Sequence, residues 1–485
     1  MKIKKSLLML SSICGAAVLV SCGGRGDNIG PVETDGFIKE KTQIVFKTTA
    51  GKGSQPVLER YIKSFKEIEP NVEVVLDIVQ GSYADIAKNT ISGFTTGDYG
   101  DLVMVYPDAV ADFIDYGRAF NLDPYINSTE YGFSKEDLND ILPTFLDEGR
   151  KYVVDGTYSL PMAKSTEVVY YDQDRILNLE ITGINNGNPI DEDYLNSLTW
   201  EEFFGNFCPK IMDYVQTEEG KALLNTSDTN HAVMSYDSDD NLFITLAEQN
   251  GFDYTGVENG KGKAKFNNDN MKQLMYKWND YSKKHYITSA GASGKRSNEL
   301  FQTNSVLFSV GSTAGASYQN KTEKVKVGVF KIPHAEGRDP KVILQGPSIS
   351  ILRHKNAENK WDENRQLASW LFYKHMVESE NCLDWSLNAN YMPIRKSLYS
   401  HPDYIESNKL QGLSPTSLDA LKARINNYIG NLTDYYYTSP AFKGSNECRQ
   451  QVGGIVSVAL TPTKGQAEIN EVFQSAYNQS VIAIG

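Results

Sequence analysis

The sequence predicts an α/β protein whose body divides into two lobes, and three observations support this prediction. Segments with strand-like and helix-like spacing of apolar residues alternate along much of the chain. The 485 residues exceed one typical domain, because a domain usually holds roughly 100 to 200 residues. The composition, with 40% hydrophobic and 22% charged residues, is that of a globular protein and not of a disordered or fibrous one.

The charge balance and the cysteines limit the possible partners and cofactors. The chain has 61 acidic and 48 basic residues, a formal charge of −13, and no concentrated basic patch, so we expect no nucleic-acid binding. Three cysteines remain in the predicted mature body, Cys208, Cys382 and Cys448, and an odd number cannot all pair. Because no CxxC motif or Cys/His cluster occurs, we expect no disulfide scaffold, no metal and no cofactor.

The first 21 residues are typical of an export signal. Lysines near the start precede an apolar run from Leu7 to Val20, which is shorter than the ~20 residues that span a bilayer. The run ends in Leu19-Val20-Ser21-Cys22, which resembles the lipobox of bacterial lipoproteins. This resemblance implies that the signal peptide 1–21 is removed and that Cys22 is acylated and anchors the protein to the bacterial cell membrane. An uncleaved membrane anchor is the alternative, and both interpretations export the chain.

Residues 22–41, which are rich in glycine and scattered charge, predict a flexible tether between the lipid and the body. After the tether, strands and helices alternate: strand 43–49, helix 57–68, strand 72–78, helix 83–94 and strand 102–106. This order predicts a parallel sheet, and small ligands bind outside the carboxyl ends of such strands. The loop after Thr49, which contains Lys52, and the loop after Tyr106 are therefore the first candidate sites.

Later segments continue the alternation less regularly. Thr199 and Glu202 form a capping-box pattern that predicts a helix beginning at Trp200. A loop of small residues, Gly311 to Gly315, follows a predicted strand and so lies at a strand end. The other predicted strands are 168–171, 306–310, 325–330 and 349–352, and the other predicted helices are 271–286, 364–377, 418–428, 449–460 and 467–483.

Several short motifs occur in a characteristic order along nearly the whole mature chain. They are Glu69-Pro70-Asn71-Val72, Asp101-Leu102-Val103, Asn121 to Tyr125, Asp155 to Pro161, Leu198 to Phe203, Phe301 to Gly311, Val327 to Pro333 and Tyr391 to Arg395. In order and spacing they resemble the extracellular solute-binding proteins of ABC importers, in the carbohydrate-type family that includes maltose-binding protein.

The resemblance implies a periplasmic-binding-protein-like fold of two lobes, each a β-sheet flanked by helices, joined by crossing hinge segments. Lobe 1 would combine residues 42–163 and 311–353, and lobe 2 would combine residues 164–310 and 354–485. A monomer would capture a sugar or oligosaccharide in the cleft, unaltered and without catalysis, and deliver it to membrane permease subunits. Ligand would favour the closed state only through its higher affinity for that state.

Sugar sites combine aromatic platforms with planar polar groups, and this chemistry selects the remaining candidate residues. Tyr106, Trp385 and Tyr391 are the candidate platforms, with core packing as the alternative for each. Ser165 and Thr166 lie in the implied crossover between the lobes. Ser312 and Thr313 belong to the small-residue loop, and Arg395 offers a guanidinium fork, with a surface ion pair as its alternative.

Three other functions stay open from the sequence. Arg395, Lys52 and the loop at Gly311 would also suit a sugar phosphate or a glycerol phosphodiester, although a neutral oligosaccharide is preferred. A carboxylate of maltose-binding protein is matched by Ser165 in the crossover, which disfavours maltose itself. No catalytic motif is found, but a secreted glycosidase needs only two carboxylates and a passive lipoprotein needs none.

The segment from Asp237 resembles a calcium-binding loop, but Leu242 stands where such a loop needs glycine, so a solvated acidic loop is preferred.

Overall fold

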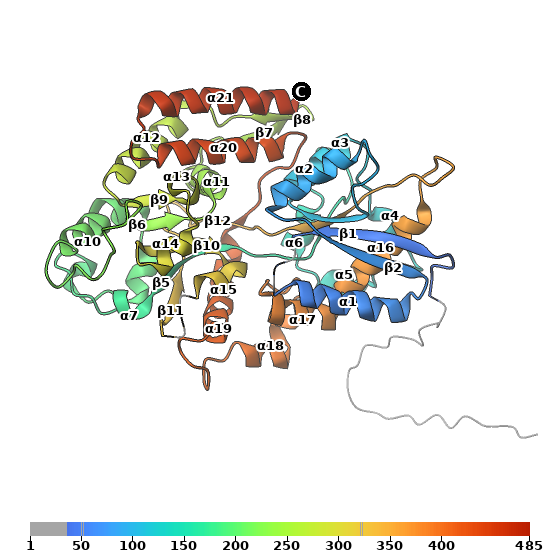
Figure 1. Cartoon of the computed structure of the whole chain (residues 1–485), viewed down its shortest axis with the longest axis horizontal. Helices are drawn as coiled ribbons and strands as arrows, with labels where there is room; N and C mark the ends of the chain where they lie inside the picture. The colour runs from blue at the N-terminus through green and yellow to red at the C-terminus, as the bar shows by residue number, and fades with distance from the viewer. Residues whose placement is uncertain (1–35, 50, 52, 321, 323) are drawn as a thin grey trace, which may run out of the picture.

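The computed structural model describes residues 36–49, 51, 53–320, 322 and 324–485, and Figure 1 shows their arrangement. The predicted signal peptide, Cys22, most of the predicted tether and Lys52 lie outside the described residues. In the described part of the chain, no helix combines the length and apolar character needed to span a membrane. Two sheets flanked by helices form two halves of the molecule, which confirms the predicted α/β class.

The first half is built on a five-stranded sheet with the order β2-β1-β3-β13-β4. Its strands are β1 (Thr42–Thr48), β2 (Val72–Ile78), β3 (Leu102–Val105), β4 (Leu160–Pro161) and β13 (Ser348–Ile351). β1 pairs in parallel with β2 and β3, as the sequence predicts, whereas β13 pairs in antiparallel with β3 and β4. The carboxyl ends of β1, β2 and β3 therefore share one edge of the sheet.

Helices cover this sheet with apolar faces. In α1, Val57, Leu58, Tyr61 and Phe65 are buried, the spacing from which the sequence predicts this helix. The helices of this half are α1 (Gln55–Ile68), α2 (Tyr83–Gly93), α3 (Pro107–Asp115), α4 (Asp123–Ile126), α5 (Lys135–Asp140), α6 (Pro143–Glu148), α16 (Glu363–Met376) and α17 (Ser379–Ala389), followed by η4 (Ser397–Ser400) and α18 (Pro402–Ser407).

The second half is built on another five-stranded sheet, with the order β11-β5-β10-β6-β9. Its strands are β5 (Glu167–Asp172), β6 (Ala232–Tyr236), β9 (Ile287–Ser289), β10 (Val306–Ser312) and β11 (Val327–Phe330). β10 is parallel to β6, and β6 is parallel to β9, so their carboxyl ends also share an edge. β10 continues two residues beyond the predicted strand, so Gly311 and Ser312 belong to it.

Many short and long helices surround the second sheet. Thr199 caps the helix that begins at Trp200 by accepting a hydrogen bond from the Glu202 N–H, as predicted. The helices are α7 (Gln173–Ile176), η1 (Asn185–Gly187), α8 (Glu192–Ser197), α9 (Trp200–Glu202), η2 (Phe203–Phe207), α10 (Cys208–Tyr214), α11 (Asp239–Asn250), α12 (Asp269–Lys283), α13 (Ala290–Ser293), α14 (Ser297–Gln302), η3 (Thr313–Gly315), α15 (Ala316–Gln319), α19 (Leu418–Ile429), η5 (Gly430–Tyr435), α20 (Ser445–Ala459) and α21 (Gln466–Ile484). Two small sheets pair β7 (Thr255–Glu258) with β8 (Lys261–Ala264) and β12 (Val342–Ile343) with β14 (Tyr436–Tyr437).

The predicted division of the chain between the lobes needs correction in two places. Residues 354–485 do not all belong to the second lobe, because α16 packs on the first sheet and α17 on α1. Phe372 of α16 lies 6.1 Å from Phe46 of β1 and 5.1 Å from Phe65 of α1, between ring centroids. Residues 311–353 do not all belong to the first lobe, because β11 pairs with β5. Periodicity identifies a buried face but not the sheet that buries it.

Two crossing segments run side by side between the halves. The backbones of Ser165 and Gln345 exchange two hydrogen bonds, of 2.9 and 3.0 Å. Next to them, the ammonium of Lys164, which is fully buried, pairs with Glu148 and donates to the Gly346 carbonyl at 3.0 Å. The buried polar groups of these two segments, which we call the hinge, therefore have hydrogen-bond partners.

Candidate functional site

A cavity of about 900 Å³ lies between the two halves. Its walls come from the loops at the carboxyl ends of β1, β2 and β3 on one side, and of β6 and β10 on the other. This size is within the range of small-molecule sites, which is roughly 300 to 1,000 Å³. The aromatic and polar side chains that line the cavity include Tyr83, Tyr106, Asp237, Asp239, Asp240, Asn241, Arg296, Glu299, Ser312, Tyr318, Gln319, Tyr391, Asn446, Arg449 and Gln450.

The wall from the first half is aromatic. The rings of Tyr83 and Tyr106 meet edge to face with their centroids 5.3 Å apart, and the hydroxyls of Tyr83 and Tyr391 lie 3.3 Å apart. Trp385 stacks behind Tyr391, with centroids 5.4 Å apart and an interplanar angle of 6°. Burial raises the pKa of Tyr106 and of Tyr391, so both phenols stay neutral and can donate hydrogen bonds.

The wall from the second half is polar and charged. Asp237, which follows β6, accepts the Ser297 N–H at 3.1 Å and pairs with the Arg296 guanidinium at 3.4 Å. Glu299 accepts the N–H of Arg296 at 3.0 Å, which fixes the first turn of α14. Burial raises the pKa of Asp239 to about 6.

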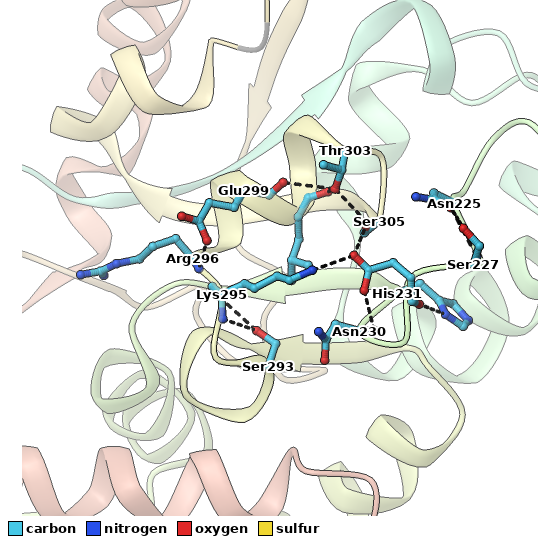
Figure 2. A network of polar contacts seen from close by, with 12 residues as sticks. Asn225, Ser227, Asn230, His231, Ser293, Lys295, Arg296, Glu299, Thr303 and Ser305 are labelled. Atoms are coloured by element: carbon cyan, nitrogen blue, oxygen red, sulfur yellow. Dashed lines mark hydrogen bonds and ion pairs between the residues drawn. The ribbon is translucent and has the colours of Figure 1, made fainter.

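The loop before α14 places Arg296 in this wall. Figure 2 shows Lys295 and Arg296 pointing in opposite directions from this loop. The Lys295 ammonium lies 3.0 Å from the Asp228 carboxylate, which also accepts a hydrogen bond from Ser305 at 2.9 Å. This ion pair anchors one side of the loop, and the neighbouring side chains of Arg296 and Glu299 line the cavity.

Arg449 of α20 joins the two walls. Its Nη1 donates to Asp240 at 2.9 Å and to the side-chain oxygen of Asn241 at 2.7 Å, and both acceptors belong to α11 of its own half. Its Nε donates to Asp108 of α3, in the other half, at 2.8 Å. The guanidinium carbon also lies 5.8 Å from the centre of the Tyr106 ring.

A buried network connects the cavity to the hinge. The amide of Asn241 donates to Glu167, at the start of β5, at 2.7 Å and to Gln345, in the other crossing segment, at 2.9 Å. Glu167 also accepts a hydrogen bond from the Tyr236 hydroxyl. Burial raises the pKa of Glu167 from its ordinary value of 4.5 to about 7.

Three of the predicted site residues line the cavity: Tyr106, Ser312 and Tyr391. Three others lie in the hinge beside it. Ser165 accepts from the Ser312 hydroxyl at 3.3 Å, the Thr166 hydroxyl donates to the Ile343 carbonyl, and the Thr313 hydroxyl accepts the Thr166 N–H. Trp385 supports Tyr391 from behind and does not line the cavity itself.

Arg395 requires a correction. Only 3% of this residue is exposed, and its guanidinium donates to the Val377 carbonyl at 2.7 Å and to Asp137 at 3.0 Å. It is not among the residues that line the cavity, so its role in the structure is to join α5 to the segment after α17. Lys52 lies outside the described residues and stays a prediction.

Sequence reasoning missed most of the charged wall. The sequence favours a solvated loop for the acidic segment that begins at Asp237, whereas in the structure Asp237 and Asp240 line the cavity. No local sequence pattern marks Arg449 as a site residue, because its partner Asp108 is 341 positions away in the chain. Among the described residues, no group of three His, Cys, Asp or Glu side chains is arranged to hold a metal ion.

The arrangement favours an uncharged, hydroxyl-rich ligand. Four carboxylates and two guanidinium groups line the described part of the cavity, and both guanidinium groups are paired with carboxylates. An anionic ligand would therefore meet net negative charge. Tyrosine rings suit the C–H faces of a sugar ring. Carboxylates accept hydrogen bonds from its hydroxyls, and side-chain amides both accept and donate them.

Comparisons with known proteins agree with this geometry. Residues 60–412 match the family model described as bacterial extracellular solute-binding protein. No curated protein matches the chain.

Solved structures resemble the chain over most of its length at low identity. Maltose-bound MalE3 of T. maritima has a TM-score of 0.65 at 16% identity, with 91% of this chain and 100% of that chain covered. UgpB from Mycobacterium tuberculosis in complex with glycerophosphocholine has a TM-score of 0.64 at 16% identity, covering 90% and 99%. Lmo0181 from Listeria monocytogenes in complex with cycloalternan has a TM-score of 0.66 at 14% identity, covering 91% and 99%. At such identities the likeness shows the shared two-lobed fold.

Proposed function

The chain belongs to the family of bacterial extracellular solute-binding proteins, and from this premise we propose that it captures a neutral sugar or oligosaccharide for an ABC importer. The observation that supports the proposal is the cavity of about 900 Å³ with tyrosines on one wall and carboxylates and amides on the other. The two walls belong to different lobes, so a solute held by both favours the closed arrangement. Membership of the family places the protein outside the cytoplasm.

The identity of the solute is proposed from charge and size. A sugar phosphate or glycerol phosphodiester is the alternative, but Asp237 already neutralises Arg296, and Asp108 and Asp240 already neutralise Arg449. A free guanidinium or a run of backbone N–H groups is what a phosphate needs. The volume accommodates more than one sugar ring, which favours an oligosaccharide over a monosaccharide.

Delivery completes the proposed function. After removal of residues 1–21, acyl chains on Cys22 would hold the monomeric body at the membrane surface, with residues 22–41 as a tether. Tethering raises the effective concentration of the loaded protein near its permease subunits. The solute leaves the cleft chemically unchanged, so the protein acts as a carrier and not as a glycosidase.

Calorimetric titration of the purified protein tests this proposal. The panel contains maltotriose, cellotriose, xylotriose, chitotriose, glycerol 3-phosphate and glycerophosphocholine. We expect saturable binding of a neutral trisaccharide and no binding of the two phosphates, with the sugar recovered intact by mass spectrometry. Binding of a phosphate alone would overturn the assignment of a neutral solute, and cleavage of a sugar would overturn the carrier function.

A further inference from the structure

One face of α3 carries three carboxylates that meet the other lobe. Asp108, Asp112 and Asp115 have the spacing i, i+4 and i+7, which places them on the same side of a helix. All three contact the start of α20 or the residues before it. The Asp112 carboxylate accepts the Gly444 N–H at 2.8 Å, and the Asp115 carboxylate lies 3.2 Å from the Lys443 ammonium.

The third contact, between Asp108 and Arg449, is much more buried than the ion pair of Asp115 with Lys443. The side chains of Asp108 and Arg449 are 9% and 13% exposed, whereas those of Asp115 and Lys443 are 44% and 49% exposed. A charged hydrogen bond in a desolvated position is stronger than an exposed ion pair, which contributes little. We call the contacts of α3 with residues 443–449 the interlobe seam.

The seam depends on closure. Val110 and Phe113 of α3 are buried in one cluster with residues of β3, so α3 belongs to the first half. α20 packs on α11 of the second half, so separation of the lobes pulls Asp108 away from Arg449. Arg449 keeps Asp240 and Asn241 as acceptors in its own lobe when this happens. The contact can therefore form and break without unfolding either lobe.

We propose that Asp108 is a positioning residue that holds Arg449 in the cleft wall and stabilises the closed state of the protein. Asp108 does not line the cavity between the two halves, whereas Arg449 does. Asp108 therefore acts on the solute only through Arg449 and through closure of the lobes. The affinity of a two-state binder falls in proportion to the fraction of molecules in the competent state. The inference rests on the proposed capture of a solute between the lobes.

The chain offers a matched control for this inference. Asp108→Asn and Asp115→Asn remove the same charge from the same face of α3, but only the first removes the buried contact. Asp108→Glu keeps the charge and tests whether a carboxylate at this place restores the effect. Each variant is compared with the wild-type protein by titration with the tightest-binding trisaccharide of the panel and by the radius of gyration from small-angle scattering.

For Asp108→Asn we expect a Kd about 10- to 100-fold higher and a larger radius of gyration without sugar, with the wild-type radius recovered at saturation. Asp115→Asn should change Kd less than about threefold. Asp108→Glu should lie closer to wild type than Asp108→Asn does.

An Asp108→Asn variant with unchanged Kd and unchanged sugar-free radius would overturn the inference, as would equal losses in Asp108→Asn and Asp115→Asn. If the wild-type protein binds none of the sugars, the proposed function fails on its own. The sugar-free radii of the variants then still decide whether the seam stabilises the closed state.

Discussion

Glu167→Gln should flatten the dependence of stability on pH. Glu167 opens β5 at the crossing between the lobes, and its carboxylate accepts hydrogen bonds from Asn241 and Tyr236. Burial raises its pKa from 4.5 to about 7. The glutamine is close in shape, can accept the Asn241 bond through its oxygen, and carries no charge at any pH.

The sign and size of the effect follow from linkage. Below pH 4.5 the carboxyl group is protonated in both the folded and the unfolded state, and it costs nothing. Between pH 4.5 and 7 the unfolded chain ionises first, so stability is lost as the pH rises through this window. Above pH 7 the full cost is present, on the order of 3 kcal/mol at about 1.36 kcal/mol per pKa unit.

Thermal unfolding at pH 5 and pH 8 measures this effect. For a chain of this length the unfolding entropy is about 1 kcal/mol per degree. Ionisation of Glu167 should therefore lower the melting temperature of the wild-type protein by about 2 to 3 °C between pH 5 and pH 8. Glu167→Gln should remove this loss. Glu471→Gln, on an exposed position of α21, should retain it. Equal pH dependence in wild type and Glu167→Gln would refute the reasoning.

Three further predictions concern the cleft, the buried arginine and the hinge. Tyr106→Ala should weaken sugar binding by about 1 to 3 kcal/mol in calorimetric titration, with the circular dichroism spectrum unchanged; an unchanged Kd removes Tyr106 from the site. Arg395→Met should lower the free energy of unfolding in urea by about 2 kcal/mol through loss of its bonds to Val377 and Asp137, whereas Kd stays the same; a weaker Kd would return Arg395 to the cleft. Gly346→Ala should lower stability by at least about 2 kcal/mol, because φ is +99° and the new Cβ would lie 2.0 Å from the Ala163 carbonyl; a melting temperature within about 1 °C of wild type contradicts this.

The sequence predicts the first sheet well because its pattern is local. Residues 43–106 contain strands and helices whose spacing can be read without knowledge of distant segments, and β1, β2 and β3 form the expected parallel pairs. The placement of α16 could not be read in the same way. Its contact with the first sheet depends on Phe372 meeting Phe46, more than 300 positions earlier, and helical periodicity carries no information on that pairing.

The residues of the candidate site show the same difference between local patterns and contacts with distant segments. Tyr106 and Ser312, which line the cavity, could be proposed from the sequence because each stands at or just beyond the carboxyl end of a strand, a position that topology alone makes a ligand rim. Arg395 and Arg449 show the limit of this reasoning. Both lie in the last third of the chain, and their roles depend on distant partners. Arg395 is buried beside Asp137, whereas Arg449 bonds Asp108 and forms part of the cleft wall.

Small-angle scattering with and without the bound sugar, followed by analysis of the released sugar, tests the central claim most directly. The account predicts that a saturating trisaccharide lowers the radius of gyration and that the sugar is recovered with its mass unchanged. Superimposable scattering curves under saturation, or a sugar returned in fragments, would contradict a carrier that closes on its cargo.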